Sequence, residues 1–424
     1  MDALVKPAPL KRHVAAVVIG NALEFYDFTT YGYFATQIGR TFFPSQSPFV
    51  SLMASLAAFG IGFAARPAGA IFFGRYGDRY GRKPAMLACF VLMGAAILLL
   101  ALTPSYAAIG IAAPALVVIA RLLQGLAVGG DVGPTTAFLL EAAPEDRRGF
   151  YSALQYASQG MSTLAGGFVG VVLSRMLDAQ ALTDYGWRIA FLLGAVILPV
   201  GFLIRRALPE TFHEDERAQT ATADAPVPWR IMILGFVILG AGTIGFYVTA
   251  YMTTFATATL HMNTSVAFGA TMAFGLANIL FSTFAGSMSD RFGRRPWMIW
   301  PRITFALSVI PLFLLIVHNR DALTLLTATF VMGGLGQMGV VGFVALSEAI
   351  PKHMRCAALA TTYAAAITVF GGTTQFIITW LIHATGNPLA PAWYVTIAAV
   401  FGIVAMILMP ETAPVILNRR ESAA

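Results

Sequence analysis

Long apolar stretches, separated by short polar breaks, recur along the whole chain. A helix needs about 20 predominantly apolar residues to cross a hydrocarbon core of about 30 Å, and these stretches reach that length. We therefore predict an all-α membrane protein with twelve membrane-spanning helices, over residues 13–38, 49–73, 84–103, 109–140, 149–174, 187–207, 229–258, 265–287, 296–317, 322–348, 356–383 and 390–409.

A ten-residue phrase occurs twice, about half the chain length apart. Residues Gly74–Lys83 read G-R-Y-G-D-R-Y-G-R-K, and residues Gly286–Arg295 read G-S-M-S-D-R-F-G-R-R. The repeat predicts two pseudo-symmetric six-helix bundles, residues 1–207 and 229–424, joined by a polar cytoplasmic linker at 208–228. Such repeats are typical of secondary transporters, whose halves move about a central site.

Composition and charge exclude other classes of protein. The chain is 58% hydrophobic and 11% charged, against roughly 25% charged residues in a soluble domain. Its net charge of +7 comes from lysines and arginines at the termini and the even-numbered connections, whereas only Arg40, Arg175, Arg188 and Arg320 flank the odd-numbered ones. We therefore expect the chain to lie in the plasma (inner) membrane with both termini in the cytoplasm, as the positive-inside rule predicts. Because this topology accounts for the positive charge, the charge is no evidence for a nucleic-acid partner.

Catalytic chemistry has no support in the sequence. No nucleophile with a matching base, nucleotide-binding loop or soluble signalling domain is recognisable, and the six histidines lack metal-ligand spacing. We expect no catalytic residues, no metal site and no cofactor, so the chain is not expected to be an enzyme.

Five ionisable residues fall inside predicted spans: Glu24, Asp27, Arg66, Arg121 and Asp131. Each costs about 2.5 to 3.5 kcal/mol near the bilayer centre, so each needs a partner, a wet cavity or a function. At 1.5 Å per residue, Asp27 lies roughly 21 Å from the cytoplasmic end of its span and Arg121 about 18 Å from the outer end of its own. These two side chains are thus predicted to share a level near mid-membrane.

The intramembrane charges have two readings. They can neutralise one another as structural ion pairs, but replacing a buried pair with apolar residues is often neutral or stabilising, which makes this a weak reason to retain them. Burial raises the pKa of a carboxylate and a nearby cation lowers it, so that a carboxylate under both influences can exchange protons near neutral pH. We predict Glu24, Asp27 and Asp131 as proton-coupling residues. Arg121 is predicted to bind a substrate carboxylate, because its planar fork donates two parallel hydrogen bonds.

Uncharged polar side chains in the spans complete the predicted substrate site. Amides and hydroxyls also bridge transmembrane helices, for about 0.6 kcal/mol each, and this remains the alternative for every one of them. The predicted set is Asn21, Gln124, Gln155, Ser158, Gln159, Tyr247, Tyr251, Thr254, Asn278, Tyr363 and Gln375. Arg302, near the start of the ninth span, is instead expected to extend toward the cytoplasmic surface.

The repeated phrase, G-x-x-x-D-R-x-G-R-K/R, resembles the signature loop of the major facilitator superfamily. The segment R-L-L-Q-G-L-A-V-G at Arg121–Gly129 is similar to the arginine motif that this superfamily carries in its fourth span. Exporters of the superfamily usually have a Gly-Pro motif in the fifth span. The fifth span here has no proline, so the resemblance favours import.

The resemblance also implies a cytoplasmic gate. Glu141 and Arg148 have the same spacing as Glu348 and Arg355, and a P-E-T triplet at Pro209 returns at Pro410. In the superfamily, such charges pair when the cavity opens outward and separate when it opens inward. The gate is expected to comprise Asp78, Arg79, Arg82, Glu141, Arg148, Asp290, Arg291, Arg294, Glu348 and Arg355.

Four segments resemble the metabolite:proton symporter branch: Gly20–Tyr33, the R-P-x-G sequence before the first repeated loop, Gly186–Ile189 and the P-E-T triplet at Pro209. Within that branch, the first span and the segments Leu154–Gln159 and Val369–Thr374 look most like citrate and tricarballylate carriers. This implies a monomeric transporter that imports a small organic anion, a di- or tricarboxylate, together with protons or sodium ions. The alternative substrates on the same fold are a monocarboxylate, a shikimate-like acid or a zwitterion such as betaine or proline.

Overall fold

The computed structural model of the chain describes residues 11–141, 143–206, 228–351 and 355–421, without a small number of side chains inside these ranges. Within them every regular element is a helix. The first half contains α1 (Lys11–Tyr33), α2 (Ala35–Phe42), α3 (Pro48–Ala64), α4 (Arg66–Tyr80), α5 (Arg82–Leu102), α6 (Tyr106–Ile109), α7 (Ala112–Glu141), η1 (Glu145–Arg147), α8 (Arg148–Met176), α9 (Ala179–Ala181), η2 (Leu182–Gly186) and α10 (Trp187–Arg206). The second half contains α12 (Trp229–Ala250), α13 (Met252–Thr254), η3 (Phe255–Thr259), α14 (Thr264–Phe292), α15 (Arg294–Asn319), α16 (Ala322–Gln337), α17 (Val340–Ala349), α18 (Arg355–Ala366), η4 (Ile367–Gly371), α19 (Gly372–Thr385), α20 (Ala390–Leu408) and α21 (Pro414–Glu421).

These helices cover all twelve predicted spans, with end shifts of a few residues. Several spans are interrupted. The second one breaks at Ala65, between α3 and α4, because Pro67 lacks the N–H that would continue the helix and is tolerated in the first turn of a new one. The tenth breaks between α16 and α17 in the glycine-rich segment 333–339, where helix propensity is low. The first break is important for the site, since it places Arg66 at the start of α4.

Nine helices in the described part of the chain have the length and apolar composition to cross a membrane. The other three predicted spans fall on α1, α8 and α10. Helices α1 and α8 carry many of the amide, hydroxyl and carboxylate side chains that the sequence assigned to the site, and these lower their hydropathy. Two of the three helices that do not meet the criterion, α1 and α8, are therefore ones that carry predicted site residues.

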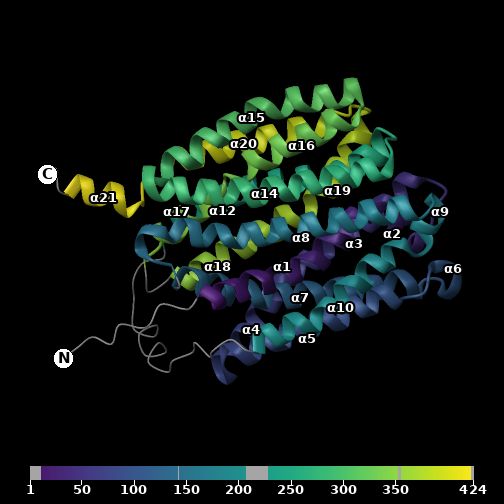
Figure 1. The fold of residues 1–424 in the computed structure, drawn as a ribbon, viewed down its shortest axis with the longest axis horizontal. Helices are drawn as coiled ribbons and strands as arrows, with labels where there is room; N and C mark the ends of the chain where they lie inside the picture. Colours follow the sequence, from purple (N-terminus) through teal and green to yellow (C-terminus); the bar gives the residue numbers. More distant parts are fainter. Residues whose placement is uncertain (1–10, 142, 207–227, 352–354, 422–424) are drawn as a thin grey trace.

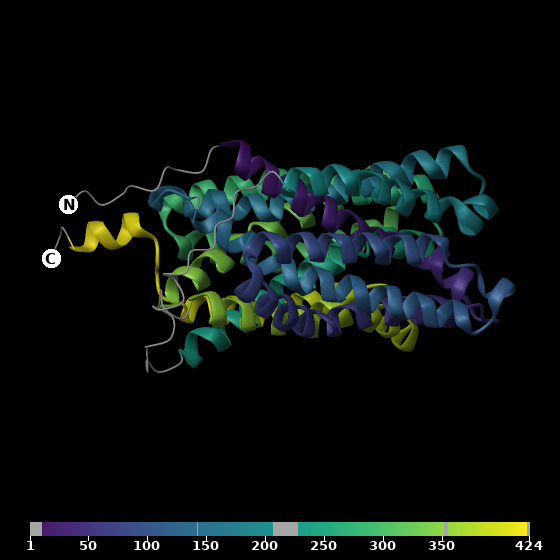
Figure 2. The same ribbon diagram turned by 90° about the horizontal axis from the view of Figure 1, so that it is seen from below.

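The helices run side by side along the long axis of the molecule, and those of the first half form a group separate from those of the second (Figure 1). Turned by 90°, the molecule shows the same lengthwise bundle (Figure 2). The first turn of α1, helix α21 and both repeated loops lie at one end, which we call the basic end. The two loops also share a backbone device: Gly81 and Gly293, equivalent in the repeat, have φ of 105° and 100°. A side chain is strained at such an angle, so glycine is required at both positions.

Helices α8 and α14 form the long contact between the two halves, and small residues let them approach closely. A Cβ added at Gly160 would lie 2.9 Å from the carbonyl oxygen of Gly275, and one added at Gly286 would lie 2.5 Å from that of Gly149. Real Cβ atoms do not come this close to a carbonyl oxygen, so the two backbones touch only because these positions lack side chains.

We predict that Gly275→Leu forces α8 and α14 apart. Overpacking of this kind costs on the order of 1 to 3 kcal/mol, and a lower thermal unfolding midpoint of the purified protein measures it. Gly74→Leu is the matched control, because a Cβ at Gly74 meets nothing within 4 Å. Equal midpoints for the two variants would contradict the tight contact.

Candidate functional site

A continuous polar chain joins α7 to α1 in the middle of the first half. Nη1 of Arg121 donates to Oε1 of Gln124 at 2.5 Å, and Nε2 of Gln124 donates to Oδ2 of Asp27. All three side chains are fully buried. Arg121 and Gln124 lie three residues apart, which puts them on one face of α7. The predicted common level of Arg121 and Asp27 is confirmed by this bridge, in which an amide stands between the cation and the carboxylate.

Aromatic rings surround the guanidinium of Arg121. Its Cζ lies 4.5 Å from the ring centre of Tyr31, 4.7 Å from that of Phe28 and 5.0 Å from that of Phe59. Ring faces attract a cation through their quadrupoles but accept no conventional in-plane hydrogen bond from it. Among the described residues, Nε and Nη2 of Arg121 accordingly have no hydrogen-bond partner. The charge is therefore sheltered while part of its donor capacity is unused.

A second guanidinium shares this aromatic cluster. Cζ of Arg66, at the start of α4, lies 4.4 Å from the centre of the Phe28 ring and 4.2 Å from that of Phe63. The second half reaches the cluster through Tyr247 on α12, whose ring packs edge-on against Phe59 and Phe63. The site thus combines residues from α1, α3, α4, α7 and α12.

Another group of predicted site residues connects α1 to α8. Nδ2 of Asn21 donates to Oγ of Ser158 at 2.6 Å, and Oγ of Ser162 donates to the carbonyl oxygen of Ala22 at 2.5 Å. Gln155 and Gln159 are also buried on α8. These bonds are helix-bridging bonds, which favours the structural alternative for Asn21 and Ser158 in this state. Glu24 is buried on α1 beside them.

The second-half residues of the predicted set are dispersed. Asn278 is buried on α14, and neither atom of its amide has a partner in the described part of the chain. Gln375 on α19 faces α1, since a Cβ on Gly32 would lie 3.5 Å from its Oε1. The hydroxyl of Tyr251 instead accepts from Thr379 at 2.8 Å within the second half. Two more residues complete the set: Tyr363, whose ring packs against Phe343 at 5.8 Å, and the buried Thr254.

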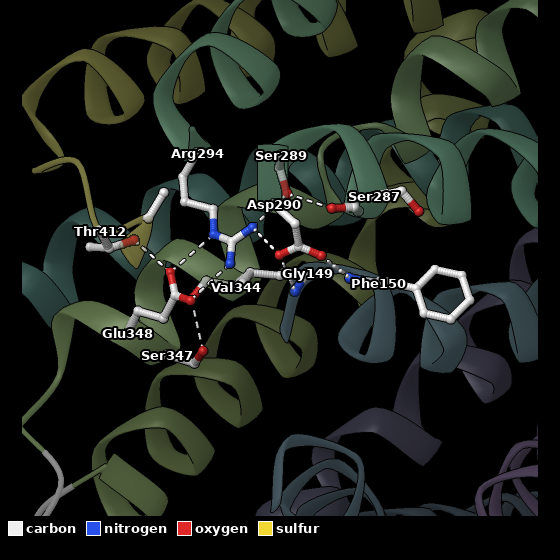
Figure 3. Close-up of polar contacts among 12 residues, drawn as sticks. Gly149, Phe150, Ser287, Ser289, Asp290, Arg294, Val344, Ser347, Glu348 and Thr412 are labelled. Atoms are coloured by element: carbon white, nitrogen blue, oxygen red, sulfur yellow. Dashed lines mark hydrogen bonds and ion pairs between the residues drawn. The ribbon is translucent and has the colours of Figure 1, made fainter. Parts of the chain in front are cut away.

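At the basic end, Arg294 joins two carboxylates in a buried cluster (Figure 3). Its Nε and Nη2 donate to Oε2 and Oε1 of Glu348 at 3.0 and 2.9 Å, and its Nη1 donates to Oδ1 of Asp290 at 2.7 Å. Thr412 donates to Glu348 at 2.8 Å, and Glu411 accepts from the backbone N–H of Arg294 at 2.8 Å. The second copy of the P-E-T triplet, which begins at Pro410, therefore supports the gate cluster, whereas the first copy lies outside the described residues.

Asp290 also binds the opposite half. Its carboxylate accepts from the backbone N–H groups of Gly149 and Phe150 at 2.8 and 2.9 Å, in the first turn of α8 (Figure 3). An acid at a helix N-terminus satisfies free N–H groups and is favoured by the helix dipole. Here the acid belongs to α14 and the capped helix to the first half, so this contact holds the two halves together at the basic end.

The other predicted gate residues are less informative. Arg79 is exposed and stacks over Tyr80 at 5.4 Å, and Arg291 is exposed. Arg148 lies half-buried at the start of α8. The remaining predicted side chains, one of them in the proton-coupling set, lie outside the described residues: Asp78, Arg82, Glu141, Arg355 and Asp131.

Comparison with known proteins identifies the family. A model of the family described as sugar (and other) transporter matches residues 13–225 and again residues 217–422. The chain belongs to the sugar (and other) transporter family of the major facilitator superfamily. This is a family of transporters, so the protein is a multi-pass membrane transporter and not an enzyme.

Relatives within the transporter family differ in substrate. A citrate-proton symporter of Klebsiella pneumoniae is 36% identical over 423 residues, covering 96% of this chain and 93% of the relative. A proline/betaine transporter of Escherichia coli is 31% identical over 430 residues, covering 97% and 85%. The crystal structure of a D-xylose-proton symporter matches with a TM-score of 0.75 at 19% identity, covering 96% of this chain and 98% of that one. It confirms the predicted major facilitator fold.

Three features of this transporter were not foreseen. The aromatic cluster of Phe28, Phe59 and Phe63 was missed, although apolar rings three or four residues from a buried charge are a usable signal. Arg66 was recognised as a buried charge but received no role. The expectation for Arg302 was wrong: its side chain is buried rather than extended to the surface, and it fits against Gly245 and Gly339 where glycine leaves room.

We predict that Asp290→Ala loosens the contact between the halves. Loss of a cap costs about 1 kcal/mol, which shifts the balance between closed and open states at the basic end severalfold. Distances between spin labels on the ends of α8 and α14 measure this shift. Asp321→Ala is the control, because Asp321 caps α16 through the N–H of Thr324 inside one half. A label distance that changes equally in both variants, or in neither, argues against the proposed role.

Proposed function

We propose that this transporter imports a small organic acid, a di- or tricarboxylate such as citrate or tricarballylate, together with protons. The observation that carries the proposal is the buried chain from Arg121 through Gln124 to Asp27. It places an anion-binding cation with unused N–H groups next to a carboxylate whose Oδ1 has no partner among the described residues. The function of the citrate-proton symporters, which match this chain along almost their whole length, supports the same substrate class.

The bridge also explains how substrate and proton can be coupled. The positive charge of Arg121 stabilises the ionised form of Asp27 through the short polar path between them. An anion that binds Arg121 compensates this positive charge and so favours a proton on Asp27. By linkage, the proton favours the anion to the same extent. The two ligands then move together, and the amide of Gln124 holds both groups in position without neutralising either.

The membrane potential makes such coupling necessary. Each net negative charge that enters a negative-inside cell is opposed by about 2.3 kcal/mol per 100 mV. A trivalent anion therefore needs at least three accompanying positive charges, which protons on the substrate and on Asp27 or Glu24 supply. We place both termini and the basic end on the cytoplasmic side, where the lysine and arginine bias puts them.

A zwitterion importer is the second candidate, because the proline/betaine transporters match the chain nearly as well. In that case Arg121 belongs to the proton relay and does not touch the substrate. Uptake measured with citrate, tricarballylate, shikimate and betaine separates the two candidates.

For Arg121→Lys we expect carboxylate affinity to fall by about tenfold or more, because an ammonium group cannot reproduce the two parallel donors of the fork. Calorimetric titration of the purified protein measures the affinity. Arg40→Lys is the control at an exposed arginine outside the site. An affinity unchanged by Arg121→Lys removes this residue from the substrate site.

For Asp27→Asn we expect a transporter that still exchanges substrate but no longer accumulates it in response to a pH gradient, because the amide mimics a permanently protonated acid. Proteoliposomes with and without an imposed gradient provide the measurement. Asp184→Asn, at an exposed acid that accepts from Gln180, is the control. Accumulation that survives in Asp27→Asn assigns coupling to Glu24, Asp131 or the substrate itself.

A further inference from the structure

Arg294 shows how a carboxylate binds to a guanidinium in this protein. Its Nε and Nη2 lie along one edge of the planar group, and they hold the two oxygens of Glu348 at 3.0 and 2.9 Å. This side-on, bidentate arrangement is the strong and geometrically specific form of the arginine–carboxylate contact.

The same edge is unused in two other buried arginines. In both Arg66 and Arg121, the atoms without a hydrogen-bond partner among the described residues are Nε and Nη2. Arg121 is 0% exposed and Arg66 is 5% exposed, so solvent scarcely reaches either group in this state. Each therefore presents, inside the membrane, the pair of donors that Arg294 uses to hold a carboxylate.

The two open edges belong to one cluster. Both guanidinium carbons lie within 4.7 Å of the centre of the same Phe28 ring. The ring of Tyr247, from the second half, packs edge-on against Phe59 and Phe63, the rings that lie next to Arg121 and Arg66. A ligand bound to both edges would therefore lie next to a side chain from the opposite half of the transporter.

Two cations in one cluster favour an anion with more than one negative group. Arg66 and Arg121 lie on the same Phe28 ring, and in the described hydrogen bonds the acid joined to Arg121 is Asp27, at the far end of Gln124. Aromatic faces reduce the cost of burying the cations but supply no negative charge. A ligand with one carboxylate would leave Nε and Nη2 of one arginine without a partner, whereas a ligand with two carboxylates would pair with both arginines.

We propose that Arg66 and Arg121 each bind one carboxylate of the same substrate, and that Arg66 makes the transporter selective for di- and tricarboxylates over monocarboxylates. This inference rests on the proposed function, in which Arg121 binds an organic acid, and adds Arg66 as a second binding and specificity residue.

Arg302 provides an internal comparison. It is also buried, but the atoms without partners in the described part are Nε and Nη1, which do not form one side-on edge. Its guanidinium packs inside the second half, next to Gly245 of α12 and the α16–α17 break at Gly339. Arg302 is therefore as buried as Arg66 but lacks an unpaired Nε–Nη2 edge, which makes it a matched control for Arg66.

The test compares ligands that differ by one carboxylate. Glutarate, valerate and tricarballylate are titrated calorimetrically into the full-length protein in lipid nanodiscs. We expect the unaltered protein to bind glutarate and tricarballylate at least about tenfold more tightly than valerate, because a second charge-assisted pair forms. Arg66→Gln should abolish this preference while it leaves valerate affinity within about twofold. Arg66→Lys should retain part of it, and Arg302→Gln should retain it fully.

Three outcomes overturn the inference. The inference is wrong if Arg66→Gln leaves the preference unchanged, if it weakens the binding of all three ligands equally, or if Arg302→Gln has the same effect. In the last two cases Arg66 supports the fold and does not select the ligand. If the unaltered protein binds valerate as tightly as glutarate, the inference fails and the proposed organic-acid function stands. If it binds none of the three acids, both fail together.

Discussion

A charge held inside a membrane has to be stabilised by something other than water, and this constraint organises the site. In the first half of the transporter, the charge of Arg121 is stabilised by the faces of aromatic rings, by the amide of Gln124 and, beyond that amide, by the carboxylate of Asp27. None of these partners uses the open edge of the guanidinium. The arginine is therefore stabilised inside the membrane while its Nε and Nη2 atoms keep no hydrogen-bond partner among the described residues. A direct ion pair with Asp27 would have been the simpler way to neutralise it, but under the proposed function such a pair would leave neither group free to exchange a ligand or a proton.

Movement between the halves depends on a different kind of contact. Helices α8 and α14 approach closely at glycines: backbone meets backbone between Gly160 and Gly275, and the side chain of Phe268 packs against Gly170. At the basic end the contact is polar and local, with the carboxylate of Asp290 on the first turn of α8. A close contact along two helices with one polar contact at its end agrees with the predicted movement of the two halves. Arg294 also donates to Asp290, so that the same carboxylate joins the gate cluster to the first turn of α8.

The relatives show how much of this arrangement is shared by the family and how much concerns the substrate. Citrate-proton symporters and proline/betaine transporters match the chain over nearly its whole length. The fold therefore does not decide between a multivalent acid and a zwitterion, since site chemistry is grafted on a common scaffold. Under our proposal the choice depends on the number of cations that bind the ligand, and two arginines lie on one aromatic ring in this structure.

The sequence by itself determined the membrane class, the twelve spans, the internal repeat and the identity of the buried charges, because hydropathy, period and the cost of burying charge are local properties of the chain. It also placed Arg121 and Asp27 at one level, since helix rise is constant. Only the tertiary structure decided that Gln124 stands between them, that Arg66 joins the same aromatic cluster, and that Arg302 is enclosed by glycines. These facts depend on how helices distant in sequence rotate and cross, which is set by close packing among many side chains at once and leaves no signature in any one segment.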